Sequence, residues 1–116
     1  MEKWKFGIDN NKLVDLVING KKSATSSIYI GNKPNIKDKQ IILYDDNKNA
    51  CMIEIINTTI LKFKDFTLEM ILKEGEDDSL DSWRYNHINF FKNEIKDFNE
   101  DTFILFEEFK CIKIYK

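Results

Sequence analysis

The sequence predicts one α+β domain, with four or five mostly antiparallel strands and with helices at the ends or on one side of the sheet. Three observations support this fold class. The chain has 116 residues, enough for a single core and too few for a second. Apolar residues recur at helical spacing in residues 9–19 and 79–96. The other apolar runs are short, strand-like and separated by turn residues. We therefore expect residues 1–116 to form one domain.

The first helix is expected over residues 9–19, with Asp9 or Asn10 as its N-cap. Gly20 follows the last apolar position and is interpreted as the residue that closes the helix in a left-handed conformation. The aromatic residues of segment 4–6 precede the helix and are expected to pack against it as a short lead-in.

Four segments have the composition of strands. The last one carries apolar residues on both faces, as expected for a strand inside a closed or strongly curled sheet. Between the strands, residues 31–35 read as a turn and residues 45–49 as a hairpin loop. Strands are expected at residues 25–30, 39–45, 50–63 and 102–115.

Two further helices are expected in the second half of the chain. A short one spans residues 66–72 and is followed by an acidic loop at 74–78. A longer one spans residues 79–96, with Asp78 or Ser79 as its cap. Its aromatic residues and its histidine recur at i, i+3 and i+7, so they share one face of the helix.

Composition limits the function. The chain has 18 basic and 20 acidic residues, which argues against avid, nonspecific binding of nucleic acid but does not exclude a local basic groove.

Cys51 and Cys111 lie in apolar runs and are interpreted as reduced thiols. No run has membrane-spanning length and no signal region is evident, so we expect a soluble, cytoplasmic protein without a membrane partner.

The segment after the first helix places an amine near a hydroxyl. Lys22 and Thr25 are three residues apart at the entry to a strand, so their side chains converge if the backbone bends there. A lysine acts as a base only if burial or a neighbouring cation, here Lys21, lowers its pKa towards 7. The alternative is that both lysines are solvated charges at a helix C-terminus.

The acidic segment 74–78 also has two interpretations. It is a solvated loop with a helix cap, or its crowded carboxylates raise one another's pKa and supply a general acid. Its spacing fits no known cation-binding loop motif. A metal site is not expected, since a single histidine cannot complete a set of three ligands.

The aromatic face of the helix at 79–96 is either a core stripe or the wall of a pocket. In a pocket, Trp83 or Tyr29 would stack on a planar ligand, and Arg84 or His87 would contact its polar groups. In the core, His87 would be satisfied by hydrogen bonds.

Three stretches of the chain resemble the ASCH domain family, whose fold is PUA-like. The resemblance covers nearly the whole chain, and Asp77 stands where the family usually has glycine. The matching stretches are Leu13–Val17 with Gly20-Lys21-Lys22-Ser23-Ala24-Thr25-Ser26-Ser27, then Glu74-Gly75-Glu76-Asp77-Asp78-Ser79-Leu80 with Trp83-Arg84, His87 and Phe90-Phe91, and finally Phe109-Lys110-Cys111-Ile112.

The resemblance implies a small curled β-barrel with flanking helices and a cleft for RNA or a modified nucleoside. Members of the family have been linked to RNA binding, coactivator roles, ribonuclease activity and removal of acetyl from N4-acetylcytidine. In the small amidohydrolase members, a Lys-x-x-Thr pair and a glutamate are catalytic. These would be Lys22, Thr25 and Glu76 here, with Glu74 as the alternative to Glu76.

Three functions therefore stay open: an amidohydrolase of N4-acylated cytidine or a similar nucleoside, a non-catalytic module that binds single-stranded RNA, and a ribonuclease using the same cleft. We favour the amidohydrolase, with no cofactor, and with Thr25 or a water molecule as nucleophile. Candidate substrate-binding residues are Lys21, Ser23, Ser27, Tyr29, Glu74, Trp83, Arg84 and His87.

Overall fold

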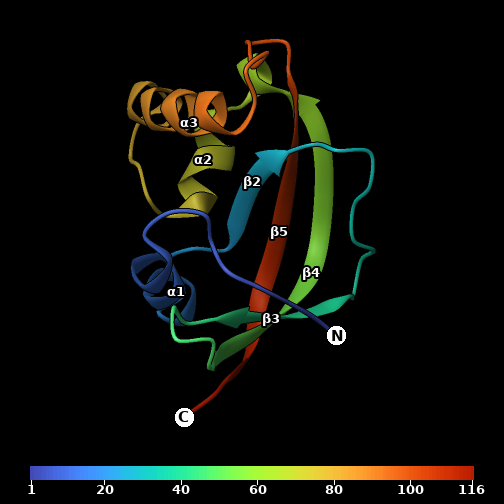
Figure 1. Ribbon diagram of the computed structural model, residues 1–116, viewed down its shortest axis with the longest axis vertical. Coiled ribbons are helices and arrows are strands. Elements are labelled where there is room, and N and C mark those ends of the chain that lie inside the picture. The colour runs from blue at the N-terminus through green and yellow to red at the C-terminus, as the bar shows by residue number, and fades with distance from the viewer.

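The computed structural model describes residues 1–116 and contains one five-stranded sheet with three α-helices beside it (Figure 1). The strands lie in the order β1-β3-β4-β5-β2. In chain order the elements are β1 (Glu2–Trp4), α1 (Asn10–Ile18), β2 (Ala24–Ile28), β3 (Lys39–Leu43), β4 (Asn49–Lys62), the 3₁₀ turn η1 (Phe63–Asp65), α2 (Leu68–Glu74), α3 (Leu80–Glu94) and β5 (Phe103–Ile114).

The sheet is antiparallel except at one edge, where β1 pairs in parallel with β3. The predicted α+β class is thus confirmed. The long pairing of β4 with β5 shifts register between Met52 and Ile53 and again between Ile55 and Asn57. Such bulges increase the local twist and bend the strands. The curled sheet stays open, since the edge strands β1 and β2 do not pair with each other.

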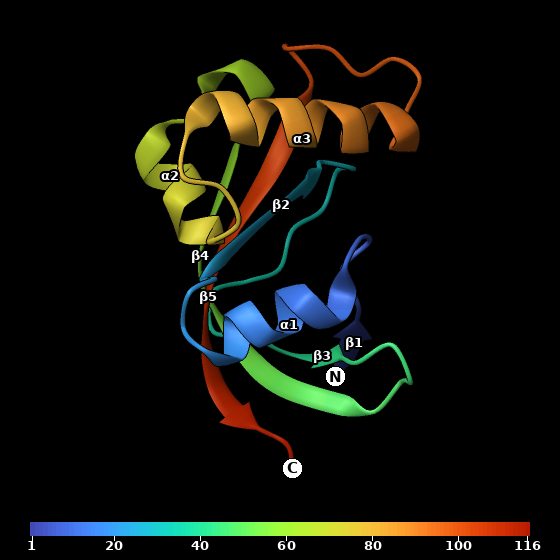
Figure 2. The same ribbon diagram turned by 90° about the vertical axis from the view of Figure 1, so that its left-hand side faces the viewer.

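The apolar core has two parts. One joins α2, α3 and η1 to the sheet and is centred on Trp83 and Phe91. The other joins α1, through Val14 and Val17, to the part of the sheet that holds Ile42, Ile53 and Phe109. Figure 2 shows α3 and α1 at different heights along the molecule, with β2 between them. This arrangement leaves room for a site between the two helices.

The N-terminal lead-in is a strand, which the sequence analysis did not predict. Trp4 lies opposite Ile42 in the parallel pairing, and its indole N–H donates to Gln40 Oε1 at 2.9 Å. Three residues are too few to show strand periodicity in the sequence. The lead-in does also pack with the α1 part of the core, as expected.

The helix ends differ in detail from the prediction. Asp9 precedes α1 but caps nothing with its side chain; the Asn10 side chain accepts from the Phe6 N–H at 2.8 Å instead. Helix α2 begins two residues later than predicted, after Thr67, whose side chain accepts from the Met70 N–H. Helix α3 begins after Ser79, which caps it as expected.

Both cysteines are free thiols. Burial and the neighbouring Cys111 raise the pKa of the Cys51 thiol to about 12, so Cys51 is an unreactive core residue. None of the helices has the length and apolar character needed to cross a membrane.

Candidate active site

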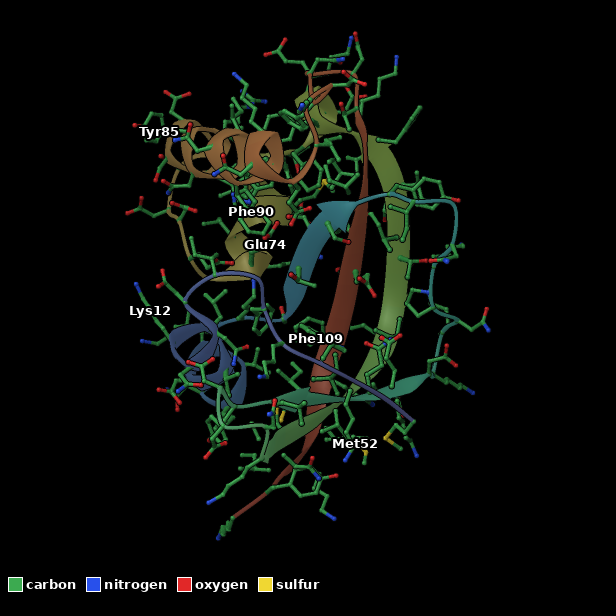
Figure 3. All side chains as sticks on the ribbon, in the orientation of Figure 1. Lys12, Met52, Glu74, Tyr85, Phe90 and Phe109 are labelled. Carbon is green, nitrogen blue, oxygen red and sulfur yellow. The ribbon has the colours of Figure 1, made fainter.

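A cavity of about 580 Å³ lies between α1 and α3. Figure 3 shows Glu74 and Phe90 in the space between the ribbons of these helices, with Lys12 projecting from α1. The cavity is lined by Phe6, Gly7, Ile8 and Asp9 of the N-terminal segment, Lys12, Leu13 and Leu16 of α1, Thr25 and Ser26 of β2, the loop Glu74–Asp77, and Asn86, His87, Asn89, Phe90 and Asn93 of α3.

One glycine brings the acidic loop against the start of β2. Gly75 ends α2 with φ +74°, and a Cβ atom there would lie 2.2 Å from the Lys21 carbonyl oxygen. Next to this contact, the Ser23 N–H donates to the Lys73 carbonyl at 2.8 Å. Only glycine permits both the backbone conformation and the close approach. Two segments fifty residues apart are thereby joined into one site.

The amine of Lys22 is buried within this junction. The residue is 2% exposed, and its Nζ donates to Glu76 Oε2 at 2.6 Å and to the Glu74 carbonyl oxygen at 3.2 Å. The Phe6 ring covers it at 5.4 Å. Glu76 is more exposed, with 24% of its side chain accessible, and it lines the cavity, whereas Lys22 does not. Lys22 is therefore not the solvated charge of the alternative interpretation.

Glu74 is the most buried acidic residue of the site, at 1% exposure. One of its carboxylate oxygens accepts from Trp83 Nε1 at 3.1 Å. The other accepts from Ser26 Oγ at 3.3 Å, lies 3.4 Å from His87 Nε2 and lies 4.0 Å from Lys22 Nζ. A carboxylate with this set of donors is fixed in one orientation.

The protonation of His87 follows from its two contacts. Its Nδ1 lies 2.8 Å from the Trp83 carbonyl, which only accepts, so Nδ1 carries a proton. Burial acts to lower the pKa of His87, but the hydrogen bond and the negative charge of Glu74 outweigh it and raise the pKa. In its charged form, Nε2–H donates to Glu74.

Glu74, Glu76 and His87 also form the geometry of a small cation site, with one ligand atom each and all three atoms within 4.8 Å of one another. The charges favour a different description. Lys22 already offsets the charge of Glu76, and a divalent ion would have to displace Lys22 from it. The site is best described as a hydrogen-bonded network around the Lys22–Glu76 ion pair, with His87 beside Glu74.

Thr25 lines the cavity together with Ser26, but its side chain makes no hydrogen bond. Adjacent residues of a strand point to opposite faces. Ala24 and Ser26 therefore face α2 and α3, whereas Thr25 faces the other side of the sheet, opposite Glu107 of β5. The structure thus brings the amine, the carboxylates and the imidazole together and leaves the Thr25 hydroxyl free at the cavity wall.

The stacking role expected of Trp83 is wrong. Its residue exposure is 0%, and its ring stacks between Phe66 at 4.6 Å and His87 at 4.3 Å. No face of the indole is open to a ligand. Trp83 instead positions Glu74 through its N–H.

Five other candidate residues lie outside the lining of the cavity. Ser27 is farther along β2, Tyr29 directly follows β2, and Arg84 donates to the Lys64 carbonyl at 3.4 Å. Ser23 Oγ lies 3.4 Å from the Lys73 carbonyl, so its hydroxyl supports the junction. Lys21 is exposed, and its contribution to the site is its backbone carbonyl.

Sequence reasoning missed Phe6, Ser26 and Asn86 as site residues. Strand alternation from the buried Ala24 would have found Ser26. Asn86 donates to Asp77 Oδ1 at 3.0 Å, and Ser82 Oγ donates to the same oxygen at 2.6 Å. The aspartate at the family's glycine position therefore ties the acidic loop to α3.

The family model for the ASCH domain matches residues 2–113. The chain belongs to the ASCH domain family. Accordingly its curled sheet with flanking helices is PUA-like. Members of the family are associated in general with RNA binding.

Solved structures agree with the assignment to the ASCH domain family. The ASCH domain from Lactobacillus crispatus is 26% identical with a TM-score of 0.86, over 96% of this chain and 79% of that one. Protein EF3133 from Enterococcus faecalis is 26% identical with a TM-score of 0.88, over 99% of this chain and 82% of that one. ZmASCH from Zymomonas mobilis, 11% identical with a TM-score of 0.61 over 91% of this chain and 70% of that one, shares the fold. A search among curated proteins gave no significant match.

Proposed function

We propose that this protein is an amidohydrolase that removes the acyl group from N4-acylated cytidine or a similar modified nucleoside. The observation that supports it best is the 2.6 Å contact between Lys22 Nζ and Glu76 Oε2 beside a cavity that Thr25 lines. Hydrolysis of an amide needs a base for the nucleophile and an acid for the leaving nitrogen. This pair supplies both.

One proton exchanged between Lys22 and Glu76 would let the pair act as both the base and the acid. Transfer of one proton from the ammonium to the carboxylate turns the ion pair into a neutral amine beside a carboxylic acid. The proposed reaction starts from this neutral pair. The amine is then ready to accept a proton, and the acid is ready to donate one.

In the proposed reaction, the Thr25 hydroxyl or a water molecule beside it attacks the acyl carbon, and its proton passes to Lys22 through water, since no direct contact joins Thr25 to Lys22. The C–N4 bond then breaks as Glu76 gives its proton to N4, and free cytidine leaves. If Thr25 attacks, a water molecule hydrolyses the acyl ester in a second step. Donors at the free edge of β2, which pairs only with β5, are available to stabilise the oxyanion.

The lining of the cavity favours a nucleoside over an RNA strand. A volume of about 580 Å³ is in the range of small-molecule pockets. The ionisable groups that line it are mostly acidic, with Lys12 and His87 as its only basic side chains. Phosphate groups would need more cations than these.

The test is release of cytidine from N4-acetylcytidine by the purified protein, compared with the variants Lys22→Met and Glu76→Gln. Each variant removes one proton carrier and is expected to lower kcat by about 100-fold or more. Lys64→Met, at an exposed lysine far from the cavity, is the matched control and should retain activity. Circular dichroism verifies that each variant is folded. Absence of release by the wild-type protein, or equal release by all four proteins, would refute the proposal.

A further inference from the structure

Glu107 is a carboxyl group that the proposed mechanism leaves unused. It lies on β5, opposite Thr25 of β2 and opposite Thr58 of β4. Directly opposed residues of antiparallel strands point to the same face, with Cβ atoms roughly 5 Å apart. Glu107 therefore shares a face of the sheet with Thr25, the residue placed at the reacting carbonyl.

The Glu107 side chain is half-buried, yet it makes neither a hydrogen bond nor an ion pair. Its neighbour Glu108 points to the other face and accepts from Lys73 at 2.7 Å and from Asn57 at 2.9 Å. A carboxyl group withdrawn from water without a partner costs free energy. Burial and the charge of Glu2 raise the pKa of Glu107 to about 7, so that its neutral form is abundant near neutrality.

Glu107 lines a second cavity, of about 830 Å³. Thr25 and Ser26 line the first cavity, and the next residue, Ser27, lines the second. Gln40 also lines the second cavity, with its side-chain oxygen accepting from Trp4. A planar ligand whose reacting group lies at Thr25 can therefore extend over the same face to Glu107.

We propose that the Glu107 carboxyl group binds the N3 and N4–H edge of the cytosine base while the acyl group lies at Thr25. This inference rests on the proposed function and names the group that selects the base. The O–H of the acid donates to N3, and its carbonyl oxygen accepts from N4–H. An ionised carboxylate has no proton to donate and would face the lone pair of N3.

The geometry also fits the leaving group. N4 carries the bond that breaks, and N3 is two bonds away on the ring. Glu107 would accept from N4–H on the face of the sheet that carries Thr25. Glu76 of the acidic loop would supply the second proton that N4 needs to leave as an amine. The amine-binding alternative, in which an ionised Glu107 holds a cation, predicts the opposite pH dependence.

The experiment measures the dissociation constant of cytidine by isothermal titration calorimetry at about pH 6 and about pH 8. Ionisation of Glu107 is expected to raise the wild-type Kd for cytidine about tenfold between these values. Glu107→Gln keeps one donor and one acceptor but does not titrate, so its Kd should change less than wild type. Glu107→Leu should bind about tenfold more weakly at pH 6. Glu108→Gln is the matched control on the opposite face.

Other charged groups near Glu107 also contribute to the pH dependence of cytidine binding. Those that line its cavity are Glu2 of β1, Lys39 of β3, Glu94 of α3, and Lys33 and Asp38 of the β2–β3 loop. Across β2, His87 titrates as well. Any pH dependence that Glu107→Gln retains belongs to these groups.

Three outcomes would overturn the inference: no binding of cytidine by the wild-type protein, unchanged affinity in Glu107→Leu, or affinity that rises with pH. These failures are separable from failure of the proposed function. Hydrolysis of N4-acetylcytidine with no role for Glu107 rejects the inference alone. Binding of cytidine that depends on Glu107, without hydrolysis, rejects the amidohydrolase and supports the binding mode.

Discussion

At the scale of single residues, Glu74 organises the site. Its carboxylate accepts from Trp83 and Ser26 and holds the His87 imidazolium, while its own backbone carbonyl accepts from Lys22. A buried carboxylate that satisfies several donors is stable only while all of them are present. We therefore propose Glu74 as a positioning residue and Glu76, the more exposed of the two, as the residue that exchanges a proton.

Replacing Glu74 by Gln should lower the pKa of His87, because the largest contributions that raise it come from Glu74. The chain has one histidine, so its NMR titration needs no assignment among alternatives. Glu76→Gln is the control and should lower this pKa less, since Glu76 contributes least. An unchanged pKa in Glu74→Gln would show that the ion pair is absent in solution.

The same pair makes stability depend on pH. Because the pKa of His87 is raised on folding, the pair stabilises the protein fully below the ordinary value of 6.5, and this contribution is lost as pH rises through the folded pKa. Glu74→Gln should cost about 1–3 kcal/mol in the free energy of unfolding at acidic pH, and less at alkaline pH. Urea unfolding of both proteins at the two pH values measures the difference, and an equal cost at both would contradict this account.

At the scale of elements, the site depends on the joint between the end of α2 and the start of β2. Gly20 and Gly75 end α1 and α2 with nearly the same φ, +78° and +74°. Their surroundings differ. A Cβ at Gly20 meets nothing within 4 Å, whereas one at Gly75 would overlap the Lys21 carbonyl. Gly20 serves the chain turn alone, and Gly75 serves the turn and the junction.

Gly20→Ala and Gly75→Ala should therefore have unequal effects. We expect the first to cost about 1 kcal/mol, from left-handed strain alone. The second should cost about 3 kcal/mol or more, because the backbone must also move. Gly75→Ala should in addition reduce cytidine release, since Glu76 would shift away from Lys22. Urea unfolding and the hydrolysis assay check both effects, and equal losses of stability in the two variants would refute the role given to the junction.

At the scale of the whole molecule, the two core parts are separate enough to leave a cavity between α1 and α3. The sheet carries both parts, and its β2 edge forms the wall of the cavity. Its lining holds two basic side chains, Lys12 and His87, against four acidic ones, Asp9, Glu74, Glu76 and Asp77. The volume of this cavity, about 580 Å³, is in the range of small-molecule pockets.

Single-stranded RNA should consequently bind weakly and with little salt dependence. With about two phosphate contacts, the slope of log K against log salt would be near −1.4. Fluorescence anisotropy of a labelled oligonucleotide at several salt concentrations measures it. A much steeper slope with tight binding would favour the RNA-binding module over the amidohydrolase.

The sequence by itself determined the α+β class, both long helices, the four longer strands and the family, because periodicity and motif spacing are local properties of the chain. It also selected Lys22, Glu74, Glu76 and His87, which the tertiary structure brings into one network. The parallel strand β1 and the burial of Trp83 were decided by packing against distant residues. The tertiary structure also decided the cross-strand pairing of Thr25 with Glu107, because the register between β2 and β5 cannot be read from either segment alone.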